Sequence, residues 1–240
     1  MGKIIILEET TKNPISLMGQ RAGVCWGGDI TDANKNYKRG LDCLASGHGR
    51  VMEYVNVEIV LEGYSARVIR EWYTHLGGSP TRLQASTRYV DYGDFPYVIP
   101  PSIKEDPMAE ERYRKVMEEI RAACNFLEME RGIPREDASM LLPLGMETRV
   151  VDKRNLRNLV DMSHQRMCSR AYHEYRGLMQ DVSQALMERS EEWYEVVTGY
   201  FMPKCEMSGY CTEKHSCGRN PKKRQIMPLN QSGFNKEEFE

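Results

Sequence analysis

The sequence predicts a single α+β domain in which helices pack on a mostly antiparallel β-sheet. Three observations favour this class. A chain of 240 residues with 40% hydrophobic content can bury one full core. The segment from Tyr54 to Glu62 alternates apolar and polar residues, as a half-buried antiparallel strand does. Helical spacing of apolar residues dominates the second half, and no internal repeat or low-complexity linker divides the chain.

The first 62 residues contain two strand patterns and two helix patterns. Lys3 to Leu7 predicts a short edge strand, and a helix from about Asn13 to Cys25 follows it. A second helix, near Asp32 to Ser46, places its apolar residues on one side. We expect Gly63 to end the strand that runs from Tyr54 to Glu62.

Ser65 predicts the start of an amphipathic helix, because its hydroxyl can accept a hydrogen bond from the first free backbone N–H groups. The apolar residues at helical spacing are Val68, Ile69, Trp72, Tyr73 and Leu76. After His75, a Gly77-Gly78 break leads into a loop rich in groups that bind anions. These groups belong to Ser79, Thr81, Arg82, Gln84, Ser86, Thr87 and Arg88. Hydroxyls, an amide and two guanidiniums suit a ligand with a phosphate and a planar polar ring.

The rest of the chain is predicted to be mainly helical. Asp91 to Ser102, rich in Pro, Tyr and Gly, indicates an ordered loop, and Asp106-Pro107 begins a long helix that reaches Arg131. Arg135 to Leu142 forms a short helix. Asp152 to about Glu188 is either one long helix or two helices broken near residues 163–165.

Composition limits the functions that the chain can have. The 33 basic and 35 acidic residues give a net charge of -2, which argues against nucleic-acid binding. The mean hydropathy is -0.60 and no apolar run is long enough to span a bilayer, so we expect a cytoplasmic protein that does not bind membranes. Residues 1–200 are predicted to form the domain. Residues 201–240 are predicted to form a polar, Cys-containing tail whose last twenty or so residues are partly disordered.

The segment around His75 resembles a motif of the flavin-dependent thymidylate synthases (ThyX). That family has an R-H-R triplet at a helix end, followed by S-x-R-Y. Ser86-Thr87-Arg88-Tyr89 matches the second part and His75 matches the central histidine. Thr74 and Leu76 replace the outer arginines, and the spacing is two residues longer. Arg82 and Arg50 are our hypothetical substitutes for the missing arginines.

Further blocks match this family in the same order along residues 1–190. Residues 47–54 are similar to G-H-x-[ST]-x-x-E-H, with Arg50 in place of the small hydroxyl residue. Residues 138–149 resemble A-R-x-x-L-P-x4-T-R, except that Ser139 replaces an arginine that contacts the nucleotide. Asn155 to Leu159, and then Arg166, follow in register.

The resemblance implies reductive methylation of dUMP to dTMP, with 5,10-methylenetetrahydrofolate as carbon donor and NADPH-reduced FAD as hydride donor. It assigns catalysis to Arg166, which would hold the uracil and stabilise negative charge on the ring. The dUMP-binding residues would be Glu71, Thr74, Gln84, Ser86, Thr87, Arg88, Ser139 and Arg166. The FAD-binding residues would be His48, Arg50, Glu53, His75, Arg82, Gln84, Asn155, Arg157 and Asp161. The family assembles its sites between the subunits of a homotetramer, so we expect an inactive monomer.

Simpler interpretations of these residues stay open. His48 could lie in an exposed turn, and His75 could complement the dipole of a helix C-terminus. Arg166 could belong to a solvated basic helix face with Arg154, Arg157 and Arg170. The altered triplet could also mark a homologue that transfers another one-carbon unit, or one that only binds flavin and nucleotide.

The seven cysteines do not predict a nucleophile or a metal site. Cys25, Cys43, Cys124 and Cys168 lie in helical, apolar contexts and are expected to be core residues in a reducing compartment. The spacing of Cys205, Cys211 and Cys217 lacks the close C-x2-C pairs of zinc sites, so we expect reduced thiols. The competing hypothesis is a zinc-stapled nucleic-acid-binding tail that includes His215.

Overall fold

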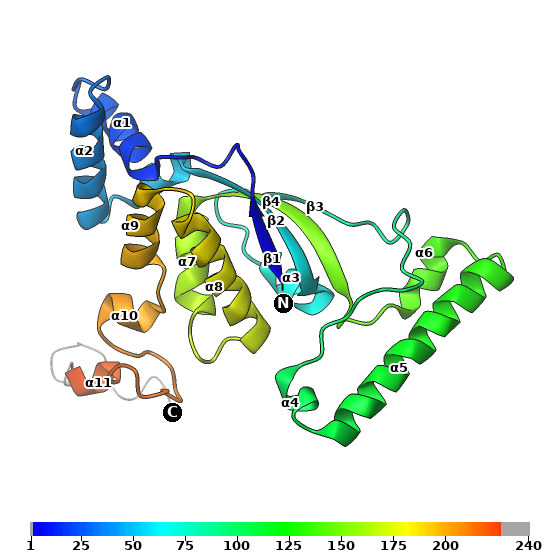
Figure 1. Ribbon diagram of the computed structural model, residues 1–240. Helices are drawn as coiled ribbons and strands as arrows, with labels where there is room; N and C mark the ends of the chain where they lie inside the picture. Colours follow the sequence, from blue (N-terminus) through cyan, green and yellow to red (C-terminus); the bar gives the residue numbers. More distant parts are fainter. Residues whose placement is uncertain (1, 227–240) are drawn as a thin grey trace, which may run out of the picture.

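The computed structural model describes residues 2–226 and contains one antiparallel sheet (Figure 1). The strand order is β1 (Lys3–Ile6), β2 (Asn56–Ser65), β4 (Glu147–Asn155), β3 (Thr81–Gln84). The helices are α1 Pro14–Cys25, α2 Ala33–Ala45, α3 Ala66–Trp72, α4 Pro101–Lys104, α5 Pro107–Asn125, α6 Arg135–Ala138, α7 Leu156–Arg166, α8 His173–Met187, α9 Glu191–Tyr200, α10 Lys204–Ser208 and α11 Lys223–Ile226. Gly49–Tyr54 and Ser139–Leu141 form 3-10 helices, and Phe126–Glu130 forms a π-helix. The predicted α+β class is confirmed.

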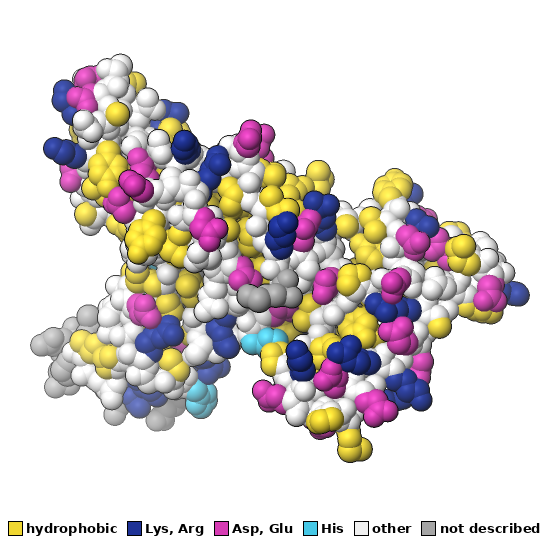
Figure 2. Space-filling view, viewed as in Figure 1, with side chains coloured by type: hydrophobic (Ala, Val, Ile, Leu, Met, Phe, Trp, Pro, Cys, Tyr) yellow, Lys and Arg dark blue, Asp and Glu magenta, His cyan; other side chains and the backbone are white. Residues whose placement is uncertain are grey.

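One face of the sheet carries the main core. The alternation in β2 directs Val57, Ile59 and Leu61 inward, where they pack with Leu159 of α7 and Leu178 of α8. The opposite face carries cross-strand ion pairs, with Lys153 Nζ 2.9 Å from Glu58 Oε1. Acidic and basic side chains are interspersed over the visible surface (Figure 2).

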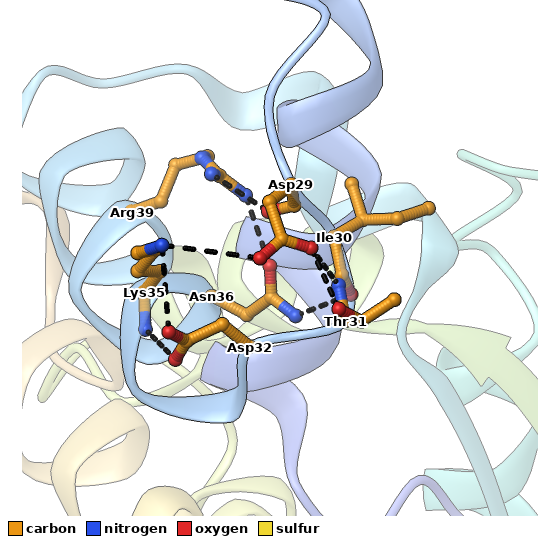
Figure 3. Close-up of polar contacts among 7 residues, drawn as sticks. All are labelled: Asp29, Ile30, Thr31, Asp32, Lys35, Asn36 and Arg39. Atoms are coloured by element: carbon orange, nitrogen blue, oxygen red, sulfur yellow. Dashed lines mark hydrogen bonds and ion pairs between the residues drawn. The ribbon is translucent and has the colours of Figure 1, made fainter.

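Helices α1 and α2 form a hairpin at one end of the molecule (Figure 1). A Cβ on Gly19 would lie 1.8 Å from the Asn36 carbonyl oxygen, so only glycine allows this close packing. The turn between the helices is held by polar contacts (Figure 3): the Asn36 amide donates to the Ile30 carbonyl at 2.7 Å, and Asp32 caps α2 by accepting from Lys35 N at 3.0 Å. Both predicted helices are confirmed.

Strand β2 lies further along the chain than the sequence pattern predicts, because Tyr54 ends a 3-10 helix and the strand begins at Asn56. It continues through Gly63 to Ser65, and its register with β4 shifts between Glu62 and Tyr64. Gly63 has φ +73°, a conformation that favours glycine, so it forms a β-bulge and does not end the strand. Ser65 then caps α3 by accepting from Val68 N, as predicted. Because α3 ends at Trp72, Leu76 lies outside the helix and is exposed, contrary to its expected place on the apolar face.

Two strands were not predicted. Residues 81–84, expected to be loop, form the edge strand β3 against β4. The helix expected from Asp152 begins only at Leu156, because residues 147–155 form β4. The helical region is then broken at residues 167–172, not at 163–165. The inward residues of β4 include Asp152 and Arg154, and these charges hide the apolar alternation of a strand.

Helix α5 extends from the end of the molecule opposite the α1–α2 hairpin (Figure 1). The Asp106 side chain accepts hydrogen bonds from the backbone N–H groups of Met108 and Ala109, and Pro107 is the first residue of the helix, as predicted. The loop before α4 contributes Tyr92 and Phe95 to a small second core with Met117. The ordered loop, the long helix and the short helix at α6 are therefore confirmed.

Helix α9 ends at the predicted domain boundary, residue 200, and the chain continues beyond it through α10 and α11. Most of the region expected to be disordered, residues 227–240, lies outside the described residues. Cys211 is buried, whereas Cys25, which was expected in the core, is exposed. Among the described helices, none combines the length and the apolar content that a membrane span requires.

Candidate active site

The segment after α3 and the end of α7 meet in a cluster formed by Glu71, His75, Arg166 and Tyr175, called here the Arg166 cluster. Arg166 Nε donates to His75 Nε2 at 3.1 Å, and Arg166 Nη1 lies 3.3 Å from Glu71 Oε2. The guanidinium carbon lies 4.7 Å from the centroid of the Tyr175 ring, which stabilises it by a cation–π contact. The sequence segments around residues 71–75, 166 and 175 thus position one guanidinium, which keeps 23% of its side chain exposed.

His75 is neutral at physiological pH. Burial lowers its pKa to about 4, with a further contribution from the positive charge of Arg166. The Arg166 hydrogen bond assigns the acceptor role to Nε2, so the imidazole proton lies on Nδ1. The histidine can therefore offer a neutral N–H donor to a ligand.

We expect His75 to titrate near pH 4, with a consequence for stability. The unfolded chain protonates at the ordinary histidine pKa of 6.5, but the folded chain protonates only near 4. Between these values the unfolded state binds more protons, so the free energy of unfolding decreases as the pH falls through this range. NMR titration of the imidazole Cε1–H signal measures the pKa. A midpoint near 6.5 would contradict the buried setting, and Arg166→Gln should raise the midpoint.

A buried ion pair lies next to the Arg166 cluster. The side chains of Asp152 and Arg154 are both 0% exposed, with Nε–Oδ2 at 2.5 Å and Nη2–Oδ1 at 2.7 Å. The Arg154 guanidinium lies 4.4 Å from the ring centroid of Trp72, which in turn stacks on Tyr175. Arg154 is therefore a core residue of β4, and the interpretation that placed it on a solvated helix face is wrong.

Arg82 lies on β3, close to the start of the loop that was predicted to bind anions. Its guanidinium carbon lies 4.3 Å from the centroid of the Tyr73 ring. Its Nη1 is buried and has no hydrogen-bond acceptor among residues 2–226. An unsatisfied buried donor is costly, so this position suits a ligand that brings an acceptor.

A second group of predicted residues, called here the Arg88 group, gathers around α6 and consists of Ser86, Arg88 and Ser139. Arg88 Nε lies 2.6 Å from Glu136 Oε2, and the Arg88 backbone N–H donates to Ser86 Oγ at 3.2 Å. Ser139 joins this group, since its hydroxyl donates to the Glu136 carbonyl at 2.9 Å. Gln84 is held separately, through a 3.2 Å hydrogen bond to Thr148 Oγ1.

A third group surrounds a cavity of about 450 Å³ between the α1–α2 hairpin and the 3-10 helix at residues 49–54. His48 and Arg50 line it together with the exposed aromatic side chains of Trp26 and Tyr54. Arg157 pairs with Glu53 of the same 3-10 helix, with Nη1 and Oε1 2.6 Å apart.

The remaining predicted residues lie along α7 and near α3. Asn155 caps α7, with its Oδ1 accepting from Asn158 N at 2.9 Å, and Asp161 is exposed on the same helix. Thr74 donates its hydroxyl to the Glu71 carbonyl at 2.7 Å. Thr87 is partly buried in the loop beside Arg88. In the part of the chain that the structure describes, no three His, Cys, Asp or Glu side chains form a group that could hold a metal ion.

Comparison with known proteins identifies the family. The family model described as thymidylate synthase complementing protein matches residues 6–190, well over half of the chain. The chain belongs to this family. A relative from Nitratidesulfovibrio vulgaris, a flavin-dependent thymidylate synthase, is 32% identical over 194 residues, which cover 77% of this chain and 76% of the relative. Another relative, a flavin-dependent thymidylate synthase from Pyrococcus furiosus, is 27% identical over 224 residues, which cover 88% of this chain and 89% of the relative. The predicted family is confirmed.

The fold of this chain also matches solved structures. Thymidylate synthase X from Helicobacter pylori, solved with FAD and dUMP, superimposes with a TM-score of 0.60 at 18% identity. The match covers 83% of this chain and all of that chain. A second structure of the Helicobacter pylori protein gives a TM-score of 0.59. The arrangement of strands and helices is therefore that of thymidylate synthase X.

Within one chain of this family member, the predicted site residues are not all together. The structure brings His75, Glu71 and Arg166 into contact, but Arg88 and Ser139 lie at α6, well separated from the end of α7 (Figure 1). Sequence reasoning missed Tyr175 and Tyr73 as platforms for guanidiniums, because no local spacing connects them to Arg166 or Arg82.

Proposed function

We propose that this chain is a FAD-dependent thymidylate synthase that converts dUMP to dTMP. 5,10-Methylenetetrahydrofolate supplies the carbon and NADPH the reducing equivalents. The observation that carries the proposal is the 3.1 Å contact between His75 and Arg166. These residues belong to separate matching blocks, and they meet at a half-open guanidinium beside a neutral imidazole. Membership of the family over residues 6–190 supports the same activity.

The residues present fit a flavin. Arg82 Nη1 and Tyr175 Oη are buried without a hydrogen-bond partner among the described residues, and neutral His75 offers an N–H donor. These polar groups suit the acceptors of a ring system and a pyrophosphate. FAD, when bound, would supply the hydride. His75, Arg82 and Asn155 would hold it, and the surroundings of His48 and Arg157 would bind its remainder.

The role proposed for Arg166 follows from its setting. Glu71, at 3.3 Å, is a loose partner, so the guanidinium can bind another polar group. We assign it to the carbonyl edge of the uracil, where a fixed positive charge stabilises the negative charge that develops on the ring. Arg88, Ser86 and Gln84 would hold the rest of dUMP, chiefly its phosphate.

We further propose a homotetramer in which each active site combines residues from different chains. The separation of the Arg88 group at α6 from the Arg166 cluster at the end of α7 supports this arrangement, because residues assigned to one nucleotide then lie apart within a single chain. In an assembly, the Arg88 group of one subunit would complete the Arg166 cluster of another.

The test of the function is an anaerobic reaction of purified protein with FAD, NADPH, dUMP and methylenetetrahydrofolate. Flavin absorbance near 450 nm and dTMP, separated by chromatography, are followed together. Reoxidation of the flavin coupled to dTMP formation is the expected result. Flavin binding without dTMP would overturn the proposed reaction, and the absence of flavin binding would overturn the cofactor as well.

Arg82→Ala is expected to weaken FAD binding by on the order of tenfold or more, since a hydrogen bond from a charged donor contributes about 1.5–3 kcal/mol. Flavin fluorescence titration of the apoprotein measures the dissociation constant. Arg112→Ala is a suitable comparison, because Arg112 is exposed on α5 and lies in none of the groups assigned to FAD or dUMP. If Arg82→Ala retained normal affinity for both FAD and dUMP, Arg82 would not replace the missing arginines of the triplet.

A further inference from the structure

A second cavity, of about 330 Å³, adjoins the Arg166 cluster on the side of the C-terminal segment. Arg166 and Arg170 line it from α7 and the following loop, and Lys204 and Glu213 line it from the segment after α9. Figure 2 shows Lys and Arg side chains where the α10 region meets the lower ends of α7 and α8. Residues 203–213 lie beyond the region that the family model matches, residues 6–190.

The C-terminal segment is fixed in place by polar contacts. Arg170 Nε lies 3.2 Å from Glu213 Oε2, and Arg170 Nη1 donates to the His215 carbonyl at 3.4 Å. Within the segment, Arg219 Nη1 lies 3.1 Å from Glu206 Oε1, and the Cys211 backbone N–H donates to the Pro221 carbonyl. The wall of the cavity is therefore an ordered part of the fold.

The lining of the cavity has an excess of positive charge. Three basic side chains, Arg166, Arg170 and Lys204, face one carboxylate, Glu213. His164 also lines the cavity, and its Nε2 is buried without a hydrogen-bond partner among residues 2–226. A cavity with excess cations and an unsatisfied polar group is suited to an anionic ligand.

We propose that this cavity binds the glutamyl carboxylates of the folate co-substrate. This proposal rests on the proposed thymidylate synthase activity. The carbon of the folate ends on the uracil, so the folate must bind close to the uracil site, and Arg166 belongs both to that site and to the cavity wall. A volume of 330 Å³ accommodates one end of such a molecule.

The distribution of the charges favours carboxylates over the phosphates of NADPH. Phosphates are typically cradled by backbone N–H groups of a glycine-rich loop at the start of a long helix. Among the residues described by the structure, no glycine lines this cavity, and its cations come from separate points on α7, the loop after it and the C-terminal segment. Carboxylates spaced along a glutamyl chain match separate cations.

The test compares pteroylmonoglutamate with pteroyltriglutamate, binding to the full-length protein loaded with FAD and dUMP, by calorimetry. The triglutamate is expected to bind several-fold more tightly, with an advantage that shrinks as ionic strength rises. Lys204→Gln should reduce that advantage by about three- to tenfold. Lys38→Gln, on the exposed face of α2, is the matched control and should leave it unchanged.

Glu213→Gln separates ligand binding from a structural role. It removes a carboxylate from the cavity lining, so triglutamate binding should become stronger. Equal binding of the two folates by the wild-type protein would overturn the proposal. So would weaker triglutamate binding in both variants, or an effect of Lys204→Gln on the KM for NADPH alone. The binding comparison does not depend on turnover. A failure to form dTMP would therefore contradict the proposed function, whereas equal binding of the two folates would contradict only the proposed folate site.

Discussion

Arg166→Gln is expected to lower kcat/KM for dUMP by on the order of tenfold to a few hundredfold, the range that corresponds to one charge-assisted hydrogen bond of about 1.5–3 kcal/mol. Arg166 is held between His75 and the Tyr175 ring, so glutamine can replace neither its charge nor its cation–π contact. Because the charge would act on the developing negative ring, kcat should decrease as well as the affinity for dUMP. Steady-state dTMP formation at varied dUMP concentration measures both.

The matched control is Arg114→Gln, which removes an exposed ion pair with Glu110 on α5. It should retain wild-type kinetics, because exposed ion pairs contribute little to the fold and this pair lies away from the Arg166 cluster. If Arg166→Gln changed the rate no more than Arg114→Gln, the assignment of Arg166 to the uracil would be wrong.

Asp152→Asn is expected to reduce the free energy of unfolding by about 3–5 kcal/mol. The substitution keeps the shape of the side chain but removes its charge, and it leaves the Arg154 guanidinium buried without a counter-ion. The contacts of Arg154 with Asn158 and Trp72 do not supply a negative charge. Urea denaturation at one fixed protein concentration measures the change, because the stability of an oligomer depends on concentration.

Glu58→Gln provides the comparison for this result, since Glu58 pairs with Lys153 on the exposed face of the same sheet. Glu58→Gln should reduce the free energy of unfolding by about 1 kcal/mol or less, because solvent screens the Glu58–Lys153 pair. If the two variants lost the same free energy of unfolding, burial would not be the cause of the large effect expected for the Asp152–Arg154 pair.

The sequence predicts those elements whose stabilising signals are local. Asp32, Ser65 and Asp106 accept hydrogen bonds from the starts of three helices, and the apolar alternation of β2 is visible without knowledge of its neighbours. Strand β4 was missed because its inward positions include Asp152 and Arg154, whose burial depends on contacts between residues distant in sequence. Strand β3 has only four residues and owes its conformation to pairing with β4.

In the candidate site, too, some features follow from local sequence and others depend on tertiary contacts. The order of the motifs connected His75 and Arg166 to one family, and the structure brings these two side chains together. Neither the Tyr175 ring beneath Arg166 nor the Tyr73 ring beside Arg82 follows from spacing, because each contact depends on how the helices pack. The position of Arg88 at α6 depends on tertiary structure in the same way.

Subunit complementation tests most directly whether the separated groups form one active site between chains. Arg88→Ala and Arg166→Ala chains, each with a different affinity tag, are coexpressed, and oligomers that carry both tags are isolated and assayed for dTMP. If one chain supplies Arg88 and another Arg166, some sites in the mixed oligomer contain both native arginines, so its activity should exceed that of either parent. A mixed oligomer no more active than its parents would contradict an active site shared between subunits.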